Sequence, residues 1–206
     1  MAGLREKQKA NRRQLIENAA SDLFTAKGFS ETTIEEIAEE ALVSAATVYN
    51  YYGTKGDLLL ALVAHGEEAI SEDAASFQEL ANDKDPADLL VDVILSNVSD
   101  TLNTLGRELW AQVVAFVATA GDDEVGPRYI EMISGGLVNA LDAVGLSLIE
   151  AGKLPKGLDT RHLAQMLTRL ERVHFLNFLY IRNQTWDEMA DAIRVDVELI
   201  ISPFEA

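Results

Sequence analysis

The chain has 206 residues, no cysteine and a formal net charge of −17 at pH 7. This length allows one large domain, or a small domain joined to a larger one, with a real hydrophobic core. The absence of cysteine excludes disulfides, thiolate zinc sites and thiol nucleophiles. The three histidines, His65, His162 and His174, show no metal-ligand spacing.

No secretion or membrane signal is apparent in the sequence. The opening segment, MAGLREKQKANRRQ, is too polar for a secretory signal. The longest uncharged apolar stretch, residues 109–121, is shorter than the ~20 residues that cross a bilayer. We therefore expect a cytoplasmic protein that does not bind a membrane.

The negative charge is unevenly distributed along the chain. Residues 1–55 hold seven basic and eight acidic residues, a net charge of −1, whereas residues 56–206 carry −16. Five of the basic residues form an N-terminal arm: Arg5, Lys7, Lys9, Arg12 and Arg13. Such an arm suits a phosphate backbone, although a disordered solubilising tail has the same composition.

The first third of the chain predicts four helices. Apolar residues at helical spacing indicate a helix over about residues 9–27, which Gly28 ends. Thr33 and Glu36 form a capping box for the second helix, and Ser44 caps a third over about 45–51. A fourth begins near Gly56 and continues toward residue 80.

The remaining sequence also predicts only helices. The N-terminal signals are Asp85 before Pro86, Asp159, and a second capping box of Thr185 with Glu188. The expected helices cover about residues 86–104, 106–120, 126–152, 160–183 and 186–201. With no strand alternation of useful length, the sequence indicates an all-α protein of about nine helices in all.

One set of residues in the segment 10–62 follows a familiar order without gaps: Ile16, Ala19, Ala20, Leu23, Phe24, Gly28, Phe29, Thr33, Ile37, Ala38, Ala41, Val43, Ser44, Thr47, Val48, Tyr49, Tyr52, Lys55 and Leu58. With these residues the segment resembles the DNA-binding domain of the tetracycline-repressor (TetR) family. The resemblance implies an N-terminal three-helix helix-turn-helix domain, residues 1–55, and a larger helical ligand-binding and dimerisation domain, residues 56–206.

The sequence departs from the family pattern at three positions. Leu42 stands where glycine is common in the turn between the second and third helices, so its side chain must tolerate a conformation that glycine adopts freely. Ala46 stands where glycine or another small residue is common. Tyr52 replaces the frequent phenylalanine, which is accommodated if its hydroxyl reaches solvent.

The third helix is the predicted recognition helix, which lies in the DNA major groove. The predicted DNA contacts are Thr33, Ser44, Ala45, Ala46, Thr47, Tyr49, Asn50, Tyr51 and Lys55. Ala45, Ala46 and Thr47 cannot make bidentate hydrogen bonds to bases, so we expect methyl contacts there. The resemblance makes Tyr49 and Lys55 the strongest candidates for phosphate contacts. The alternatives are a core position for Tyr49 and a solvated turn for Lys55.

The segment 173–181, VHFLNFLYI, is apolar nearly all round a helix and therefore needs cover on both sides. A second chain would supply it, as in the dimers of this family, although a fully buried helix in a monomer is the alternative. The predicted interface residues are Leu170, Phe175, Phe178, Leu179, Met189, Ile193, Val197 and Ile200.

The resemblance also implies an apolar pocket for a small apolar or amphipathic effector. The predicted lining residues are Trp110, Val114, Phe116, Tyr129, Met132, Met166 and Arg169, although each could be ordinary core. The resulting hypothesis is a homodimeric repressor that binds a palindromic operator, responds to an unknown effector and needs no cofactor. An enzyme is disfavoured because GxSxG, HExxH, P-loop and GxGxxG motifs are missing. A helical protein-interaction module that keeps the helix-turn-helix as a scaffold is a third possibility.

Overall fold

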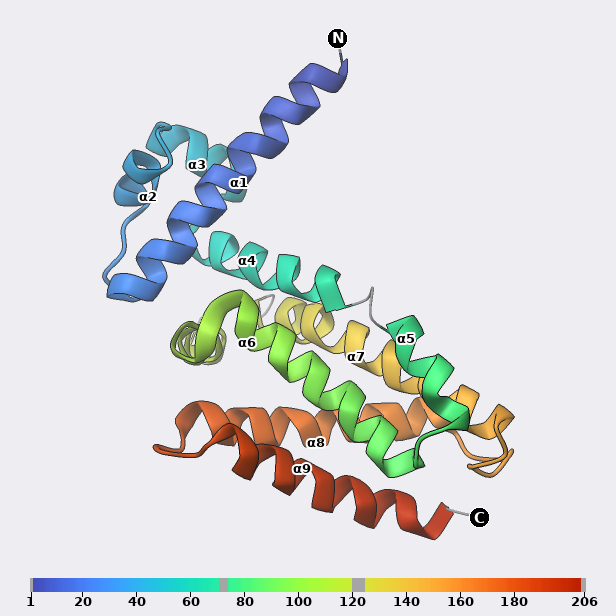
Figure 1. Cartoon of the computed structure of the whole chain (residues 1–206). Helices are drawn as coiled ribbons and strands as arrows, with labels where there is room; N and C mark the ends of the chain where they lie inside the picture. Colours follow the sequence, from blue (N-terminus) through green and yellow to red (C-terminus); the bar gives the residue numbers. More distant parts are fainter. Residues whose placement is uncertain (1, 71–73, 120–124, 205–206) are drawn as a thin grey trace. The chain divides into compact units, whose positions relative to one another are not determined.

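The computed structural model describes the backbone of residues 2–70, 74–119 and 125–204 (Figure 1). Within these ranges the structure does not describe the side chains of residues 2, 4, 65–70, 74–75, 104, 125–128 and 130–134. Helices make up the described elements, with no strand among them, so the all-α prediction is confirmed. In chain order they are α1 (Ala2–Lys27), α2 (Ile34–Glu40), α3 (Ala45–Tyr52), α4 (Lys55–Ile70), α5 (Ala74–Glu79), the 3-10 helix η1 (Leu80–Asn82), α6 (Pro86–Thr119), α7 (Val125–Glu150), α8 (Thr160–Tyr180), α9 (Trp186–Ile201) and the 3-10 helix η2 (Ser202–Phe204).

The chain divides into two compact units. Unit 1 comprises residues 1–65 and 104–129, and unit 2 comprises residues 66–103 and 130–206. Helices α4, α6 and α7 therefore contribute to both units. The domain boundary predicted at residues 55 and 56 remains a prediction, while unit 1 also includes the C-terminal half of α6.

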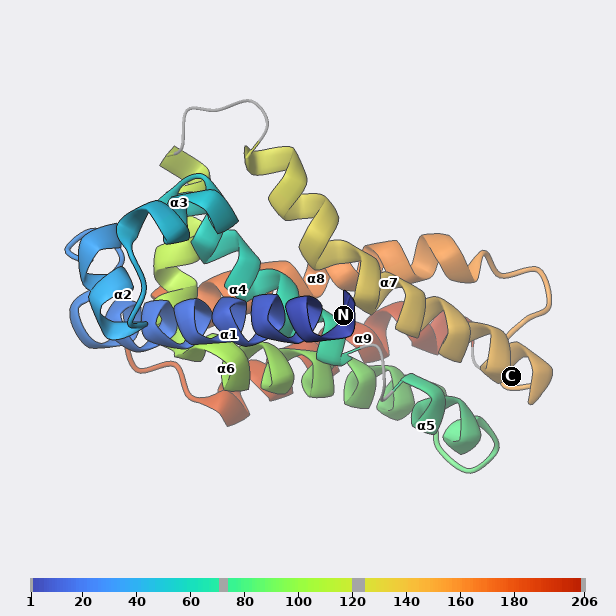
Figure 2. The same cartoon turned by 90° about the horizontal axis from the view of Figure 1, so that it is seen from above.

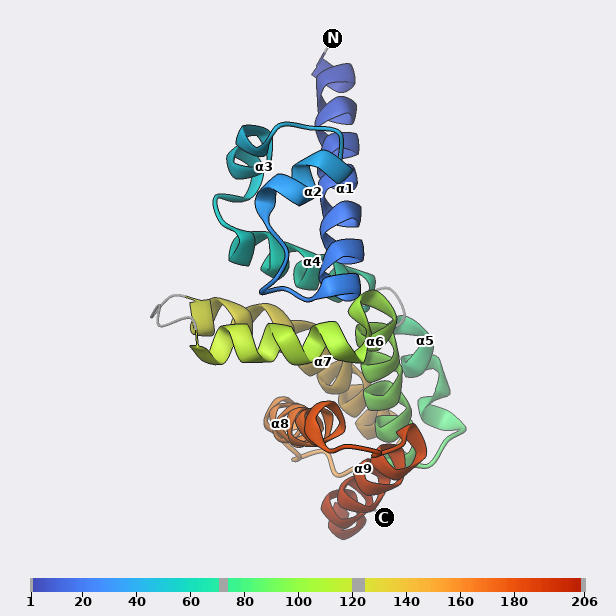
Figure 3. The ribbon, with the colours of Figure 1, turned by 90° about the vertical axis from the view of Figure 1, so that its left-hand side faces the viewer.

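Unit 1 is organised around α1, with α2 and α3 together on one side of it (Figures 2 and 3). Ile16 and Phe24 from α1, Ile37 from α2 and Val48 from α3 are fully buried. The predicted helix ends are confirmed: Gly28 has φ +90°, Thr33 and Glu36 form the capping box, and Ser44 caps α3. These local signals fix the lengths of α2 and α3, and burial of one face of each helix fixes their packing.

Three predicted helices differ in length from those observed. Helix α1 begins at Ala2 rather than near Lys9, because most residues of the basic arm are strong helix formers. The helix that was expected to reach residue 80 ends at Ile70, and α5 begins at Ala74. Helix α8 ends at Tyr180 because Ile181 is extended and Asn183 has φ +68°, a left-handed conformation that asparagine tolerates.

Helix α6 is broken at Gly106, which has φ +69° and ψ 163°. Essentially only glycine adopts this conformation. The two helices predicted before and after residue 105 are therefore confirmed as two helical segments of α6. The break lies close to residue 104, where the chain passes from unit 2 to unit 1.

Unit 2 contains α8 and α9 packed side by side (Figures 1 and 3). Phe175 of α8 and Met189, Ile193 and Val197 of α9 are buried. His174 contributes an ion pair or hydrogen bond to Asp196 of α9, with 2.8 Å between Nε2 and Oδ2, so it is a partnered side chain of the α8–α9 packing. In the part of the chain that the structure describes, no helix combines the length and apolar character that a membrane span requires.

Candidate nucleic-acid interface

The turn between α2 and α3 contains Leu42, whose side chain is 92% exposed and whose φ is +54°. Its left-handed conformation is unfavourable for leucine by roughly 1–2 kcal/mol. The turn is nevertheless closed, because the Val43 N–H donates to the Ala38 carbonyl at 2.8 Å. The non-glycine residue therefore keeps a turn of the expected geometry, with local strain at Leu42.

Ser44 fixes the start of α3. Its Oγ accepts a hydrogen bond from the Thr47 N–H at 3.2 Å and lies 2.8 Å from Thr47 Oγ1. This is the usual arrangement of a serine N-cap, which satisfies one of the free N–H groups of the first turn. The hydroxyl groups of Ser44 and Thr47 are thus engaged with each other at the helix end that was predicted to meet DNA.

One face of α3 is buried and the opposite face is open. Val48 is fully buried and Tyr52 nearly so, while Tyr49 is 48% exposed. Ala46 and Asn50 are also exposed, and Ala45, Thr47 and Tyr51 are half-buried. Tyr49 is therefore not a core aromatic. The exposed face presents methyl, amide and phenol groups, which suit methyl contacts to thymine and hydrogen bonds to bases or phosphates.

Tyr52 is held inside unit 1 by a polar contact that the sequence did not predict. Its hydroxyl donates to Oε1 of the buried Glu17 at 2.7 Å. The expectation that this hydroxyl reaches solvent is wrong, because α1 supplies an acceptor. Burial and the neighbouring Glu17 carboxylate both raise the pKa of Tyr52, so the phenol stays protonated.

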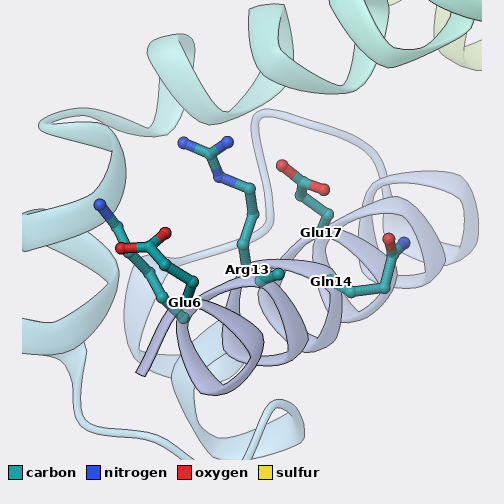
Figure 4. Close-up of a pocket in the computed structure, with 6 residues that line it drawn as sticks. Glu6, Arg13, Gln14 and Glu17 are labelled. Atoms are coloured by element: carbon teal, nitrogen blue, oxygen red, sulfur yellow. The ribbon is translucent and has the colours of Figure 1, made fainter. Parts of the chain in front are cut away.

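A hollow of about 300 Å³ lies along α1 next to this contact (Figure 4). Figure 4 shows Arg13 and Glu17 projecting from the same side of α1 into it. The lining residues are Glu6, Lys9, Ala10, Arg13, Gln14 and Glu17. Because two cations are balanced by two carboxylates, the hollow has no excess positive charge that would favour a phosphate.

Thr33, at the N-terminus of α2, is one of the predicted DNA contacts, and free N–H groups at a helix N-terminus can bind phosphate. In the structure, Thr33 donates its N–H to Glu36 Oε2 at 2.9 Å, and the Glu36 N–H donates to Thr33 Oγ1 at 3.3 Å. Glu36 also forms an ion pair with Lys27. These contacts, led by Lys27, lower the pKa of Glu36 to about 2, so a negative charge already occupies this helix end. A phosphate contact at Thr33 stays a prediction, and it would compete with the Glu36 carboxylate.

Lys55, at the start of α4, faces the loop between α1 and α2. Its Nζ donates to the carbonyl oxygens of Phe29, Ser30 and Thr32 at 2.6, 3.3 and 2.7 Å. The same ammonium lies 4.5 Å from the centroid of the Phe29 ring. Burial lowers the pKa of Lys55, although Glu31 and Glu36 act in the opposite direction. Lys55 is therefore not a solvated turn lysine, and its phosphate contact stays a prediction.

The seven predicted effector contacts fall in both units. Trp110 and Tyr129 are buried in unit 1, where Val114 and Phe116 are half-buried. Met166 and Arg169 are exposed on α8 in unit 2, which is not the environment of an interior pocket within that unit. The Met132 side chain lies outside the described residues. A common role for these residues therefore stays a prediction.

Six of the eight predicted dimer residues are buried within the single chain: Phe175, Phe178, Leu179, Met189, Ile193 and Val197. They pack inside unit 2 and present little surface to another molecule, while Leu170 and Ile200 are half-buried. Different apolar side chains of α8 and α9 are exposed: Met166, Val173, Leu176, Tyr180, Val195 and Leu199. The sequence correctly showed that the helix is apolar all round, but it did not show which side faces outward.

Two further polar residues were not predicted from the sequence. Asn97 of α6 is only 2% exposed, and neither atom of its side-chain amide has a hydrogen-bond partner among the described residues. Gln112 accepts a hydrogen bond from the Phe29 N–H. The signal for Asn97 was present, because it is a polar residue on the apolar stripe of Leu90, Val93, Ile94 and Val98. No sequence signal marked Gln112.

Comparison with solved structures supports the fold. FadR of Thermus thermophilus, a TetR-family repressor solved in complex with lauroyl-CoA, superposes with a TM-score of 0.71 at 22% identity, covering 92% of this chain and 93% of that one. FadR of Bacillus subtilis, solved in complex with stearoyl-CoA, gives a TM-score of 0.63 at 21% identity, covering 93% and 99%. Both structures therefore share this arrangement of helices.

Sequence similarity extends over most of the chain and is clearest in the helix-turn-helix. The fatty acid metabolism regulator protein of Bacillus subtilis (strain 168) is 27% identical over 169 residues, which cover 78% of this chain and 80% of that protein. Residues 16–62 match the bacterial regulatory proteins of the tetR family. Residues 16–62, which include the exposed α3 of the helix-turn-helix, therefore form a DNA-binding domain of the tetR family of bacterial regulatory proteins.

Proposed function

We propose that the protein is a ligand-responsive repressor that binds a palindromic operator as a homodimer and is released by an amphipathic effector. The observation that carries the proposal is the exposed face of α3, with Ala46, Tyr49 and Asn50 outward and Val48 buried. A helix fixed on one face and open on the other can enter the major groove without unfolding any core.

The acidic remainder of the chain suits this function. The net negative charge arises almost entirely from residues 56–206, whereas residues 1–55 sum to only −1. Few cations contact phosphate, which predicts weak non-specific binding and a shallow dependence on salt. Specificity would therefore depend on Asn50, Tyr51, methyl contacts and the shape of the DNA.

The exposed apolar side chains of α8 and α9 support a dimer. On α8, Met166, Val173, Leu176 and Tyr180 recur at spacings of seven, three and four residues, which places them on one face of a helix. Val195 and Leu199 stand one turn apart on α9 and are also exposed. A second copy of the same surface would cover them about a two-fold axis. Two recognition helices ~34–36 Å apart would then meet successive major grooves of a palindrome.

The class of effector is proposed from the relatives. The Bacillus subtilis relative is named a regulator of fatty acid metabolism, and two structures with this fold contain lauroyl-CoA and stearoyl-CoA. An acyl-CoA is amphipathic, which agrees with the effector class implied by the sequence. Asn97 supplies a buried amide without a partner among the described residues, in unit 2, that could bond a polar group within an otherwise apolar interior.

The direct test is a mobility-shift titration with DNA from upstream of the protein's own gene at low salt, followed by addition of lauroyl-CoA. We expect a retarded complex that Tyr49→Ala and Asn50→Ala weaken while circular dichroism stays unchanged. These two variants are suitable because their side chains are exposed. Failure to bind any palindrome in that DNA would exclude the repressor. Binding without release by acyl-CoA would exclude only this effector class.

A further inference from the structure

The loop between α1 and α2, residues 28–33, is held from two sides within unit 1. Its central side chain is Phe29, whose ring centroid lies 5.2 Å from that of Phe24 and 5.1 Å from that of Phe116. Thr32 in the same loop is buried, and its hydroxyl donates to the Gly28 carbonyl at 2.8 Å. Because this loop leads directly into α2, its position sets the start of the helix-turn-helix.

Lys55 holds the loop from the side of α4. Its ammonium group has three N–H donors, and three loop carbonyls accept from it at 2.6–3.3 Å. The donor capacity of the lysine is therefore filled within the protein. A phosphate oxygen could bond this ammonium only by replacing one of the carbonyls.

Gln112 and Phe116 hold the loop from the C-terminal half of α6. Gln112 Oε1 accepts the Phe29 N–H, and Phe116 packs on the Phe29 ring. The two residues stand one helical turn apart, so they face the same side of α6. Phe116 also lies against Gly56, where an added methyl group would overlap the ring. This close approach explains why glycine suits position 56.

We infer that Lys55, Gln112 and Phe116 form a clamp on the α1–α2 loop that positions the helix-turn-helix for DNA. The three are positioning residues and do not themselves contact the operator. The inference rests on the proposed function for its effect on DNA, but the clamp itself is measurable without DNA. It assigns Lys55 and Phe116 roles different from the phosphate contact and the effector contact that the sequence suggests.

The role of Lys55 is tested by the salt dependence of operator binding. We expect Lys55→Met to weaken binding at least tenfold while the slope of log K against log salt concentration stays that of the unmodified protein. A lysine that neutralises a phosphate would instead reduce that slope by roughly 0.9. A reduced slope, or unchanged affinity, would overturn the inference. Lys156→Met, an exposed lysine of unit 2, is the matched control and should change neither quantity.

The packing of Phe116 on Gly56 is tested by adding a methyl group at position 56 and then replacing Phe116 by a smaller side chain. Alanine is normally more favourable than glycine in a helix. A loss of stability in Gly56→Ala is therefore attributable to the overlap of the added methyl group with Phe116. We expect Gly56→Ala to lower the melting temperature and the operator affinity, and Phe116→Leu to restore part of both in the double variant. Unchanged behaviour of Gly56→Ala, or no recovery in the double variant, would contradict the clamp.

Hydrogen exchange of the Phe29 amide gives a result that needs no DNA. Gln112→Leu removes its acceptor, so we expect that amide to exchange at least tenfold faster while amides of α8 are unchanged. Equal exchange in both proteins would contradict the clamp. If the unmodified protein binds no operator but this amide is protected as expected, the proposed function fails and the hold on the loop stands.

Discussion

Both units pair buried hydroxyl groups, among them Thr160 and Thr168 of unit 2, but unit 2 also buries an amide that has no partner among the described residues. In unit 1, the Tyr52 hydroxyl bonds Glu17, and the buried Thr32 hydroxyl bonds the Gly28 carbonyl. In unit 2, the amide of Asn97 has no partner among the described residues, and Glu171 is fully buried with Arg172 Nη1 at 3.4 Å from its carboxylate. Burial of a polar group is costly unless a partner is present.

This difference agrees with the roles proposed for the two units. A helix-turn-helix must hold a single geometry, and specific buried hydrogen bonds exclude alternatives. Unit 2 buries an amide that has no partner among the described residues, and large apolar side chains of α8 and α9 are exposed, among them Val173 at 58% and Leu199 at 69%. Both features suit a unit that completes its interactions with other molecules, namely an effector and a second chain.

The largest expected effect follows from a charge on the exposed face of α8. Leu176→Glu would place a carboxylate in the proposed dimer surface, which should weaken the dimer about 1,000-fold, or about 4 kcal/mol. Analytical ultracentrifugation measures the dissociation constant, and operator binding should weaken with it. Gln78→Glu, at an exposed position of α5 in the same unit, should leave the dimer intact. An unchanged dimer in Leu176→Glu would place the interface elsewhere.

The next effect concerns the buried contact of unit 1. Tyr52→Phe keeps the ring but removes the donor to Glu17, so the carboxylate loses a hydrogen bond. We expect the free energy of unfolding to fall by about 2 kcal/mol, as for other hydrogen bonds to charged groups. Urea denaturation measures it, with the exposed Tyr49→Phe as the control. No loss of stability would show that Glu17 is satisfied without Tyr52.

The corresponding change in unit 2 should have the opposite sign. Asn97→Leu replaces a buried amide that lacks a partner among the described residues by an apolar side chain of similar size. We expect a gain of about 1 kcal/mol in the free energy of unfolding, because no hydrogen bond is lost and an unpaired amide is removed. The same urea titration measures the gain. Destabilisation would mean that Asn97 has a partner in the folded protein.

The smallest effect appears in the pH dependence of unit 2. Burial raises the pKa of Glu171 above its unfolded value, although Arg172 and His174 oppose the shift. The folded state therefore binds this proton more tightly than the unfolded state does. The resulting stabilisation of the folded protein is fully present below about pH 4.5 and is lost as pH rises through the folded-state pKa. Glu171→Gln should be more stable than the unmodified protein at pH 8 and similar at pH 4. Thermal unfolding at both values measures this, with Glu198→Gln, exposed on α9, as the control.

Local chemistry made much of the fold predictable. The two capping boxes, the Ser44 and Asp159 caps, and the stop at Gly28 depend on residues within one turn of each other, and all are observed. The Leu42 turn was anticipated for the same reason. The length of α1 was underestimated because its apolar face begins only at Leu15, while helix propensity extends to Ala2.

The sequence by itself determined the all-α class, most helix ends and the position of the helix-turn-helix, because caps and periodicity are local properties. Only the tertiary structure decided that Lys55 donates to loop carbonyls, that Phe116 packs on Phe29, and that Val173 and Leu176 face outward while Phe175 and Phe178 are buried. A helix that is apolar all round does not indicate which side it buries, and a lysine does not indicate which acceptor it meets. Both depend on contacts between residues far apart in the chain.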